Sequence, residues 1–153
     1  MLRAEPSNWF SWSYDVFEDD QHLTSVDLAW MREAGSFELD GQRFDITREP
    51  GWGDFVLSAG GDAICRARKP SAWFRSFKVV IADRQLTLEA QSPLNRTFVL
   101  REGGATVGEI RPQAILSRKA VVMLPECLPR AVQVFVVWLV IVLWRRQANA
   151  SAC

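Results

Sequence analysis

The sequence predicts a mainly β protein, a closed antiparallel barrel of about twelve strands that encloses a hydrophobic C-terminal α-helix. Two observations carry this prediction. Apolar and polar residues alternate in short segments from about residue 9 to residue 124, which is the period of half-buried strands. Residues 131–144 then read AVQVFVVWLVIVLW, in which only Gln133 is polar. Because 153 residues is the length of one domain, we expect a single domain over residues 1–153.

Three hairpins are the clearest strand elements. Residues 86–90 show the alternation in its simplest form, since Leu86 and Leu88 suit a core while Thr87 and Glu89 suit water. The same alternation flanks three turn dipeptides, which are Asp40-Gly41, Gly60-Gly61 and Gly103-Gly104. Less regular strands are expected near residues 11–17, 23–30, 74–82, 114–116 and 120–124.

The C-terminal apolar segment is predicted to be a helix over about residues 129–146. Fourteen consecutive residues without alternation exceed the usual length of a strand. Pro129 suits the start of a helix, and the basic Arg145 and Arg146 suit its end. The segment is rich in valine, which favours strands, so burial in the tertiary structure must outweigh local propensity.

A helix that is apolar on every side must be surrounded by protein or by lipid. Fourteen residues at ~1.5 Å each span roughly 21 Å, which is less than the ~30 Å of a bilayer core. A longer span would include the charged Glu126 and Arg130. Length therefore favours a helix inside the barrel. The alternative is a tail-anchored membrane protein that spans the bilayer with residues 131–144, and Trp144 followed by two arginines would suit a membrane interface.

The charges are balanced overall but divided along the chain. The net charge is zero, which disfavours a general nucleic-acid binder. Residues 1–64 hold 13 acidic and 4 basic residues, whereas residues 65–153 hold 5 and 14. This asymmetry indicates either a polar partner or a fold in which acidic and basic strands become neighbours.

Cysteine usage and the N-terminal sequence predict a cytoplasmic protein. Such a protein could also contact the membrane surface peripherally. Cys65, Cys127 and Cys153 are widely spaced and form no CxxC pair, so neither a disulfide framework nor a zinc ribbon is indicated. Residues 1–10 lack the apolar segment of a secretory signal.

No motif indicates an enzyme or a bound cofactor. The GxSxG, Walker, GxGxxG and HExxH patterns are all missing, and His22 is the only histidine. The acidic residues Asp15, Glu18, Asp19 and Asp20 lack the spacing of a calcium loop and are interpreted as a solvated turn. We therefore expect a non-enzymatic protein without a metal or cofactor.

The candidate binding segment is residues 65–78, CRARKPSAWFRSFK, which contains five cations and no acidic residue. Basic residues interleaved with aromatic ones suit an anionic lipid surface or another anionic ligand. The candidate ligand- or lipid-binding residues are Arg66, Arg68, Lys69, Trp73, Arg75 and Lys78. The alternative is that the cations lie on solvated strand faces while Trp73, Phe74 and Phe77 belong to the core. Trp52, between two glycines, is expected to be exposed in a loop.

The order of short strands followed by an apolar helix resembles the tubby C-terminal-like superfamily, in particular its LURP-one-related and phospholipid-scramblase-like branch. The resemblance rests on residues 55–69, 77–90, 97–110 and 131–144. It implies a barrel around a hydrophobic helix, together with binding of anionic phospholipid or attachment to a membrane. No tubby phosphoinositide motif and no scramblase calcium-binding segment aligns with these residues. A scaffold or protein-interaction module without a ligand is the remaining alternative.

Overall fold

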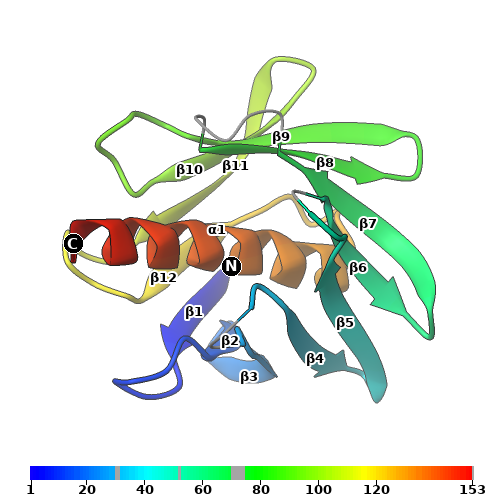
Figure 1. Ribbon diagram of the computed structural model, residues 1–153, viewed down its shortest axis with the longest axis horizontal. Helices are drawn as coiled ribbons and strands as arrows, with labels where there is room; N and C mark the ends of the chain where they lie inside the picture. Colours follow the sequence, from blue (N-terminus) through cyan, green and yellow to red (C-terminus); the bar gives the residue numbers. More distant parts are fainter. Residues whose placement is uncertain (30–31, 52, 70–74, 153) are drawn as a thin grey trace.

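The computed structural model describes residues 1–29, 32–51, 53–69 and 75–152. Over these residues, twelve antiparallel strands form a nearly closed barrel around one C-terminal helix (Figure 1). The elements are β1 (Leu2–Pro6), β2 (Tyr14–Glu18), β3 (Gln21–Val26), β4 (Gly35–Leu39), β5 (Gln42–Arg48), β6 (Phe55–Ala59), β7 (Asp62–Arg68), β8 (Ser76–Ile81), β9 (Arg84–Ala90), β10 (Phe98–Glu102), β11 (Ala105–Pro112), β12 (Ala120–Met123) and α1 (Arg130–Ser151). The predicted fold class is confirmed.

The strand order is β3-β2-β1-β12-β11-β10-β9-β8-β7-β6-β5-β4. Strands β4 to β12 therefore follow one another as a simple meander, and the N-terminal strands extend it because β1 pairs with β12. The two ends of the sheet, β3 and β4, meet at a seam. Across this seam the backbone N–H of Asp27 donates a hydrogen bond to the carbonyl oxygen of Ser36 at 3.3 Å.

The three predicted hairpins are present as β4–β5, β6–β7 and β10–β11. At the β4–β5 turn Asp40 and Gly41 have φ angles of 50° and 75°, the left-handed values that a two-residue hairpin turn with the strand twist requires. Gly60-Gly61 and Gly103-Gly104 also have positive φ angles at both residues. Local turn chemistry therefore determined these pairings.

Helix α1 runs along the inside of the barrel (Figure 1). Every residue from Ala131 to Arg145 is buried, so the strands surround the helix on all sides. Inward residues of the strands, such as Leu86 and Leu88 of β9, share one continuous core with it. By length and composition α1 could also cross a membrane, but 83% of its most apolar 18-residue window is buried within the protein.

Several elements differ from the predicted ones. The strand expected near residues 23–30 is β3, which already ends at Val26. The sheet begins with β1 at Leu2, not near residue 9, because the short terminal strand is completed only by its pairing with β2 and β12. Residues 114–116 are a turn and not a strand; Ser117 N donates to Ala114 O at 2.9 Å. The helix continues to Ser151 and not to residue 146, since its polar last turns lie outside the barrel.

Trp138 holds the seam from the inside. Its indole Nε1 donates a hydrogen bond to the carbonyl oxygen of Asp27 at 3.0 Å, and its ring lies edge-on to Phe55. Gly35 makes this approach possible, because a Cβ there would overlap the Asp27 carbonyl and lie 2.8 Å from the indole nitrogen. The buried helix therefore fixes the two edge strands relative to each other.

Candidate functional site

The two ends of the barrel differ. At the end where α1 begins, the strands are joined by short turns such as Asp40-Gly41. At the other end, where α1 emerges, longer connections join the strands, among them residues 7–13, 91–97 and 113–119 (Figure 1). The pairings of β1 with β12 and of β10 with β9 and β11 place these three connections at the same end. We call it the loop end.

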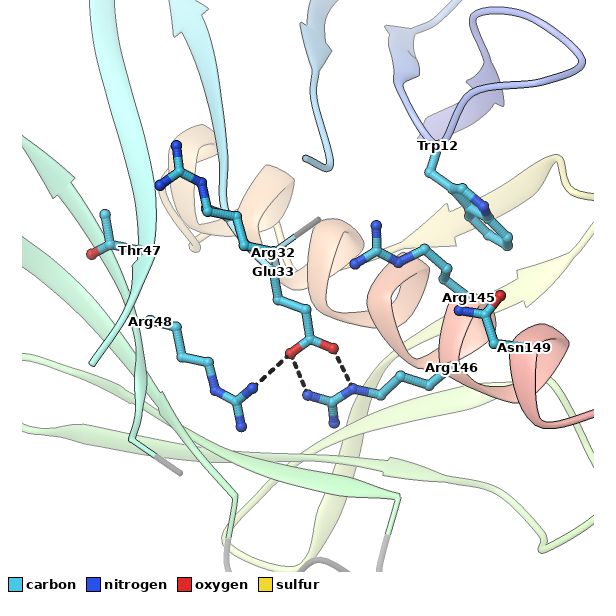
Figure 2. Close-up of a pocket in the computed structure, with 9 residues that line it drawn as sticks. Trp12, Arg32, Glu33, Thr47, Arg48, Arg145, Arg146 and Asn149 are labelled. Carbon is cyan, nitrogen blue, oxygen red and sulfur yellow. Dashed lines mark hydrogen bonds and ion pairs between the residues drawn. The ribbon is translucent and has the colours of Figure 1, made fainter. Parts of the chain in front are cut away.

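A hollow of about 720 Å³ opens at the loop end (Figure 2). Its walls come from the β1–β2 loop, the segment before β4, the end of β5 and the last turns of α1. The residues that line it are Trp12, Arg32, Glu33, Ala34, Thr47, Arg48, Arg145, Arg146 and Asn149. We call this hollow the arginine pocket, since four of the nine described residues that line it are arginines and one is acidic.

Glu33 is the centre of the hydrogen-bond network of the pocket. Arg146 donates from Nε and Nη2 to the two carboxylate oxygens, both at 2.5 Å, in a bidentate pair. Arg48 donates from Nη1 to the same carboxylate at 3.0 Å, so two guanidinium groups converge on it (Figure 2). The Glu33 side chain is 15% exposed and that of Arg146 is 30% exposed, so this charge pair is partly shielded from water.

The other two arginines have no carboxylate partner among the described residues. Arg145 is 9% exposed and donates from Nη1 to the carbonyl oxygen of Ala29 at 2.9 Å. Arg32 is exposed and points away from Glu33 (Figure 2). With four guanidinium groups and one carboxylate, the lining residues carry a formal charge of +3. The pocket therefore has positive charge that its own residues do not neutralise.

The pKa values of the pocket follow from burial and from these charges. Burial acts to raise the pKa of Glu33, but the hydrogen bond from Arg146 and the charges of Arg146, Arg48 and Arg145 outweigh it and hold this pKa below its ordinary value. Burial lowers the pKa of Arg145; the charge of Glu33 opposes this shift and that of Arg146 adds to it. Burial and Arg146 also lower the pKa of Lys69, at the end of β7. Cations are thus crowded and partly dehydrated here.

The stability that Glu33 contributes is expected to depend on pH. Its folded-state pKa is lowered from 4.5, so the contribution is complete above the ordinary value and is lost as the pH falls through the lowered one. Urea unfolding at successive pH values should show the free energy of unfolding of the wild-type chain approaching that of Glu33→Gln in acid. A difference between the two chains that stays constant down to strongly acid pH would contradict this.

Three of the residues singled out in the sequence lie on the outer wall of the barrel. Arg66 and Arg68 point outward from β7, and the exposed Lys78 lies opposite Arg68 on β8. Arg66 is ion-paired with Glu49, and Arg68 lies 3.7 Å from a carboxylate oxygen of Asp54. These three cations therefore occupy solvated strand faces, as in the alternative interpretation of the segment.

The remaining candidates are divided. Arg75 binds the backbone carbonyls of Pro93 and Asn95 and the side chain of Gln147, at 3.0–3.3 Å, and lies over the ring of Phe98. It thereby ties the last turns of α1 to the β9–β10 loop. Lys69 lies close enough to the arginine pocket for Arg146 and Glu33 to affect its pKa. Trp73, like Trp52 and Phe74, lies outside the described residues.

The charge asymmetry of the sequence is explained by ion pairs between its two halves. Acidic residues of the first half repeatedly meet basic residues of the second half. The pairs are Glu5–Lys119, Glu18–Arg130, Glu33–Arg146, Glu49–Arg66 and Asp54–Arg68. Acidic and basic segments from the two halves therefore neutralise each other at these five contacts, while the arginine pocket keeps an excess of positive charge.

Sequence reasoning did not find the arginine pocket because its residues are far apart in the chain. Arg32 and Glu33 precede β4, Arg48 ends β5, and Arg145 and Arg146 follow the apolar part of α1. The only visible signal was the Arg145-Arg146 pair, which was interpreted as a helix end. Closure of the barrel around α1 brings the three segments together.

Comparison with known proteins adds no family to this description. No family model, no curated protein and no solved structure matches the chain. Among the described residues, no group of three or more His, Cys, Asp and Glu side chains could hold a metal ion.

Proposed function

We propose that this protein is a non-enzymatic barrel that binds an anionic, phosphate- or carboxylate-bearing ligand in the arginine pocket. The observation that carries the proposal is the excess of guanidinium groups in a hollow of about 720 Å³. Guanidinium groups form paired, charge-assisted hydrogen bonds with phosphate and carboxylate oxygens. The bidentate contact between Arg146 and Glu33 is an internal example of the geometry that such a ligand would use.

The pocket favours an anion for a second reason. Arg145 is 9% exposed and donates a hydrogen bond to a neutral carbonyl, so its charge is partly dehydrated and forms no direct ion pair with a described carboxylate. Coulombic attraction is stronger where protein replaces water, because the local dielectric constant is lower. An anion near Arg145 and Arg32 would gain this attraction without displacing Glu33 from Arg48 and Arg146.

A hydrolytic activity is not part of the proposal, although Ser25, His22 and Asp15 lie together on β2 and β3. Ser25 Oγ is 3.1 Å and Asp15 Oδ1 is 3.5 Å from the same ring nitrogen, Nε2 of His22. In a catalytic triad the acid and the nucleophile bind different ring nitrogens, so that the imidazole can relay a proton between them. The group instead forms an exposed cross-strand network, in which Ser25 also donates to Asp15 at 2.5 Å.

The resemblance to the tubby C-terminal-like superfamily is also a proposal. It is supported by the arrangement of twelve antiparallel strands around a hydrophobic helix. Lipid headgroups that carry phosphate would fit the proposed ligand chemistry, and soluble phosphates and carboxylates would fit it equally. The shared chemistry is an anion small enough to enter the pocket.

Arg32→Gln is expected to weaken anion binding without changing the fold. The substitution reduces the formal charge of the lining residues from +3 to +2 at an exposed position, and we expect a roughly three- to tenfold weaker affinity. Inorganic pyrophosphate, titrated calorimetrically at low ionic strength, is the probe. A wild-type chain that shows no saturable heat and no rise in melting temperature with pyrophosphate would contradict the proposed function.

The matched control is Arg43→Gln. Arg43 is an exposed arginine on β5 that pairs with Asp45 at 3.2 Å and lies near the turn end of the strand, away from the pocket. The Arg43→Gln substitution removes one positive charge, as Arg32→Gln does, so any general electrostatic effect on binding should appear in both variants. Equal losses of pyrophosphate affinity in the two variants would argue against a site in the arginine pocket.

A further inference from the structure

Large apolar side chains protrude from the loop end. Trp9 and Phe10 in the β1–β2 loop are 84% and 87% exposed, Leu94 in the β9–β10 loop is 95% exposed, and Ile115 and Leu116 in the β11–β12 loop are 88% and 91% exposed. On the outer wall and at the other end of the barrel, the exposed large apolar residues among those described are Met1, Val80 and Met123, and they are less exposed. Exposed apolar side chains are therefore concentrated at the loop end, where they do not contribute to the hydrophobic core.

The three loops are held together by arginines. Arg118, in the β11–β12 loop, donates to the carbonyl oxygens of Trp9, at 2.8 Å, and of Ser11. Arg96, in the β9–β10 loop, donates to the carbonyl oxygens of Ile115, at 3.4 Å, and of Ser117, at 2.9 Å. Each apolar tip is thus connected to the next one by a guanidinium group, and the tips form a fixed array.

No carboxylate among the described residues pairs with these two linking arginines. Their hydrogen-bond partners are neutral backbone carbonyls, and Arg96 also lies over the ring of Trp144 and Arg118 over that of Trp12. Arg75, at the base of the β9–β10 loop, likewise binds carbonyls and an amide. The loop end therefore combines protruding apolar tips with uncompensated cations beside the arginine pocket.

We propose that the loop end docks on a lipid bilayer that contains anionic phospholipid, with Trp9, Phe10, Ile115 and Leu116 inserted at the level of the headgroups and acyl chains. This inference rests on the proposed function, since the arginine pocket would then receive the anionic headgroup. Apolar and aromatic side chains at the interface, together with cations facing an anionic surface, are the two contributions that hold peripheral proteins on membranes. Separate apolar tips at the same end of the barrel as a basic hollow suit a deformable, anionic surface.

The docking is tested by flotation with vesicles of phosphatidylcholine alone and with vesicles of equal parts phosphatidylserine and phosphatidylcholine. The variants are Trp9→Ser with Phe10→Ser, and Ile115→Ser with Leu116→Ser. Because these side chains are exposed, their loss should leave the melting temperature unchanged. We expect the wild-type chain to float with the anionic vesicles only, and each double variant to lose roughly tenfold in partitioning. Met123→Ser, an exposed apolar residue at the opposite end, is the matched control and should float like the wild-type chain.

The outcomes separate docking from the proposed function. Double variants that lose flotation but bind pyrophosphate like the wild-type chain would support both. A wild-type chain that binds pyrophosphate but ignores anionic vesicles at low ionic strength would overturn docking and leave the pocket proposal standing. Unchanged flotation of the double variants, or the same loss in Met123→Ser, would overturn docking as well. Vesicle binding that survives alkaline carbonate would overturn peripheral docking in favour of a membrane span formed by α1.

Discussion

Trp138→Ala is expected to lower the free energy of unfolding by about 3–5 kcal/mol, the usual cost of removing a fully buried tryptophan. The side chain has no exposed surface and lies in the centre of α1, where it contacts Phe55 edge-on. Removing it leaves a cavity that the surrounding barrel strands cannot fill, and it also leaves the carbonyl oxygen of Asp27 without the indole donor. Urea denaturation of the wild-type and variant chains measures the difference.

Trp138→Phe separates the two contributions. Phenylalanine keeps most of the ring volume but cannot donate to Asp27, so we expect a smaller loss, with about 1 kcal/mol from the hydrogen bond and the remainder from volume. The seam between β3 and β4 should also exchange its amide hydrogens faster in this variant, because the indole no longer holds Asp27 beside Gly35. If Trp138→Ala had no effect on stability, α1 could not occupy the core as described.

Glu33→Gln is expected to change ligand binding and stability in opposite directions. Among the described residues that line the arginine pocket Glu33 is the only acidic one, and the substitution raises their formal charge from +3 to +4. Pyrophosphate should therefore bind roughly three- to tenfold more tightly, since the anion no longer experiences the repulsion of the carboxylate. Isothermal titration at low ionic strength provides the measurement.

The same substitution should lower the free energy of unfolding by about 1–3 kcal/mol, because the amide cannot hold the charges of Arg146 and Arg48 as the carboxylate does. Saturating pyrophosphate should restore part of this stability, because the anion takes the place of the missing negative charge. Weaker pyrophosphate binding in Glu33→Gln would contradict a site among these arginines. Asp45→Asn, which removes an exposed carboxylate paired with Arg43, is the control and should affect neither quantity strongly.

Local patterns in the sequence were sufficient for most of the secondary structure. The hairpins at Asp40-Gly41 and Gly60-Gly61 were predictable because turn geometry depends on two residues and strand alternation on their immediate neighbours. The terminal strand β1 was not predictable, because five residues are too few to show a clear alternation. One of the two strands that pair with it is β12, the last strand in the sequence. The prediction of a strand at Ile115 and Leu116 was wrong, because apolar residues were assumed to be buried in the sheet. Both side chains are exposed at a loop tip.

The candidate site was less predictable than the fold. A basic run such as residues 65–78 is visible in the sequence, but alternation sends Arg66 and Arg68 to the outer wall, where acidic neighbours pair with them. Arg48 gave no signal and Arg146 was visible only as part of a helix end, because their common partner Glu33 is remote from both in the chain. Charge counts along the sequence do not show which charges are neutralised, since neutralisation depends on contacts.

The amino-acid sequence alone determined that this chain is a barrel of short antiparallel strands with an apolar helix, because alternation, turn residues and uninterrupted hydrophobicity are local properties of the chain. Only the tertiary structure decided that the helix lies within the barrel, that α1 emerges beside Glu33 and Arg48, and that three apolar loop tips share its end. The physical reason is that burial and ion pairing are set by distances in space. Those distances exist only once β1 has joined β12 and the barrel has formed around α1.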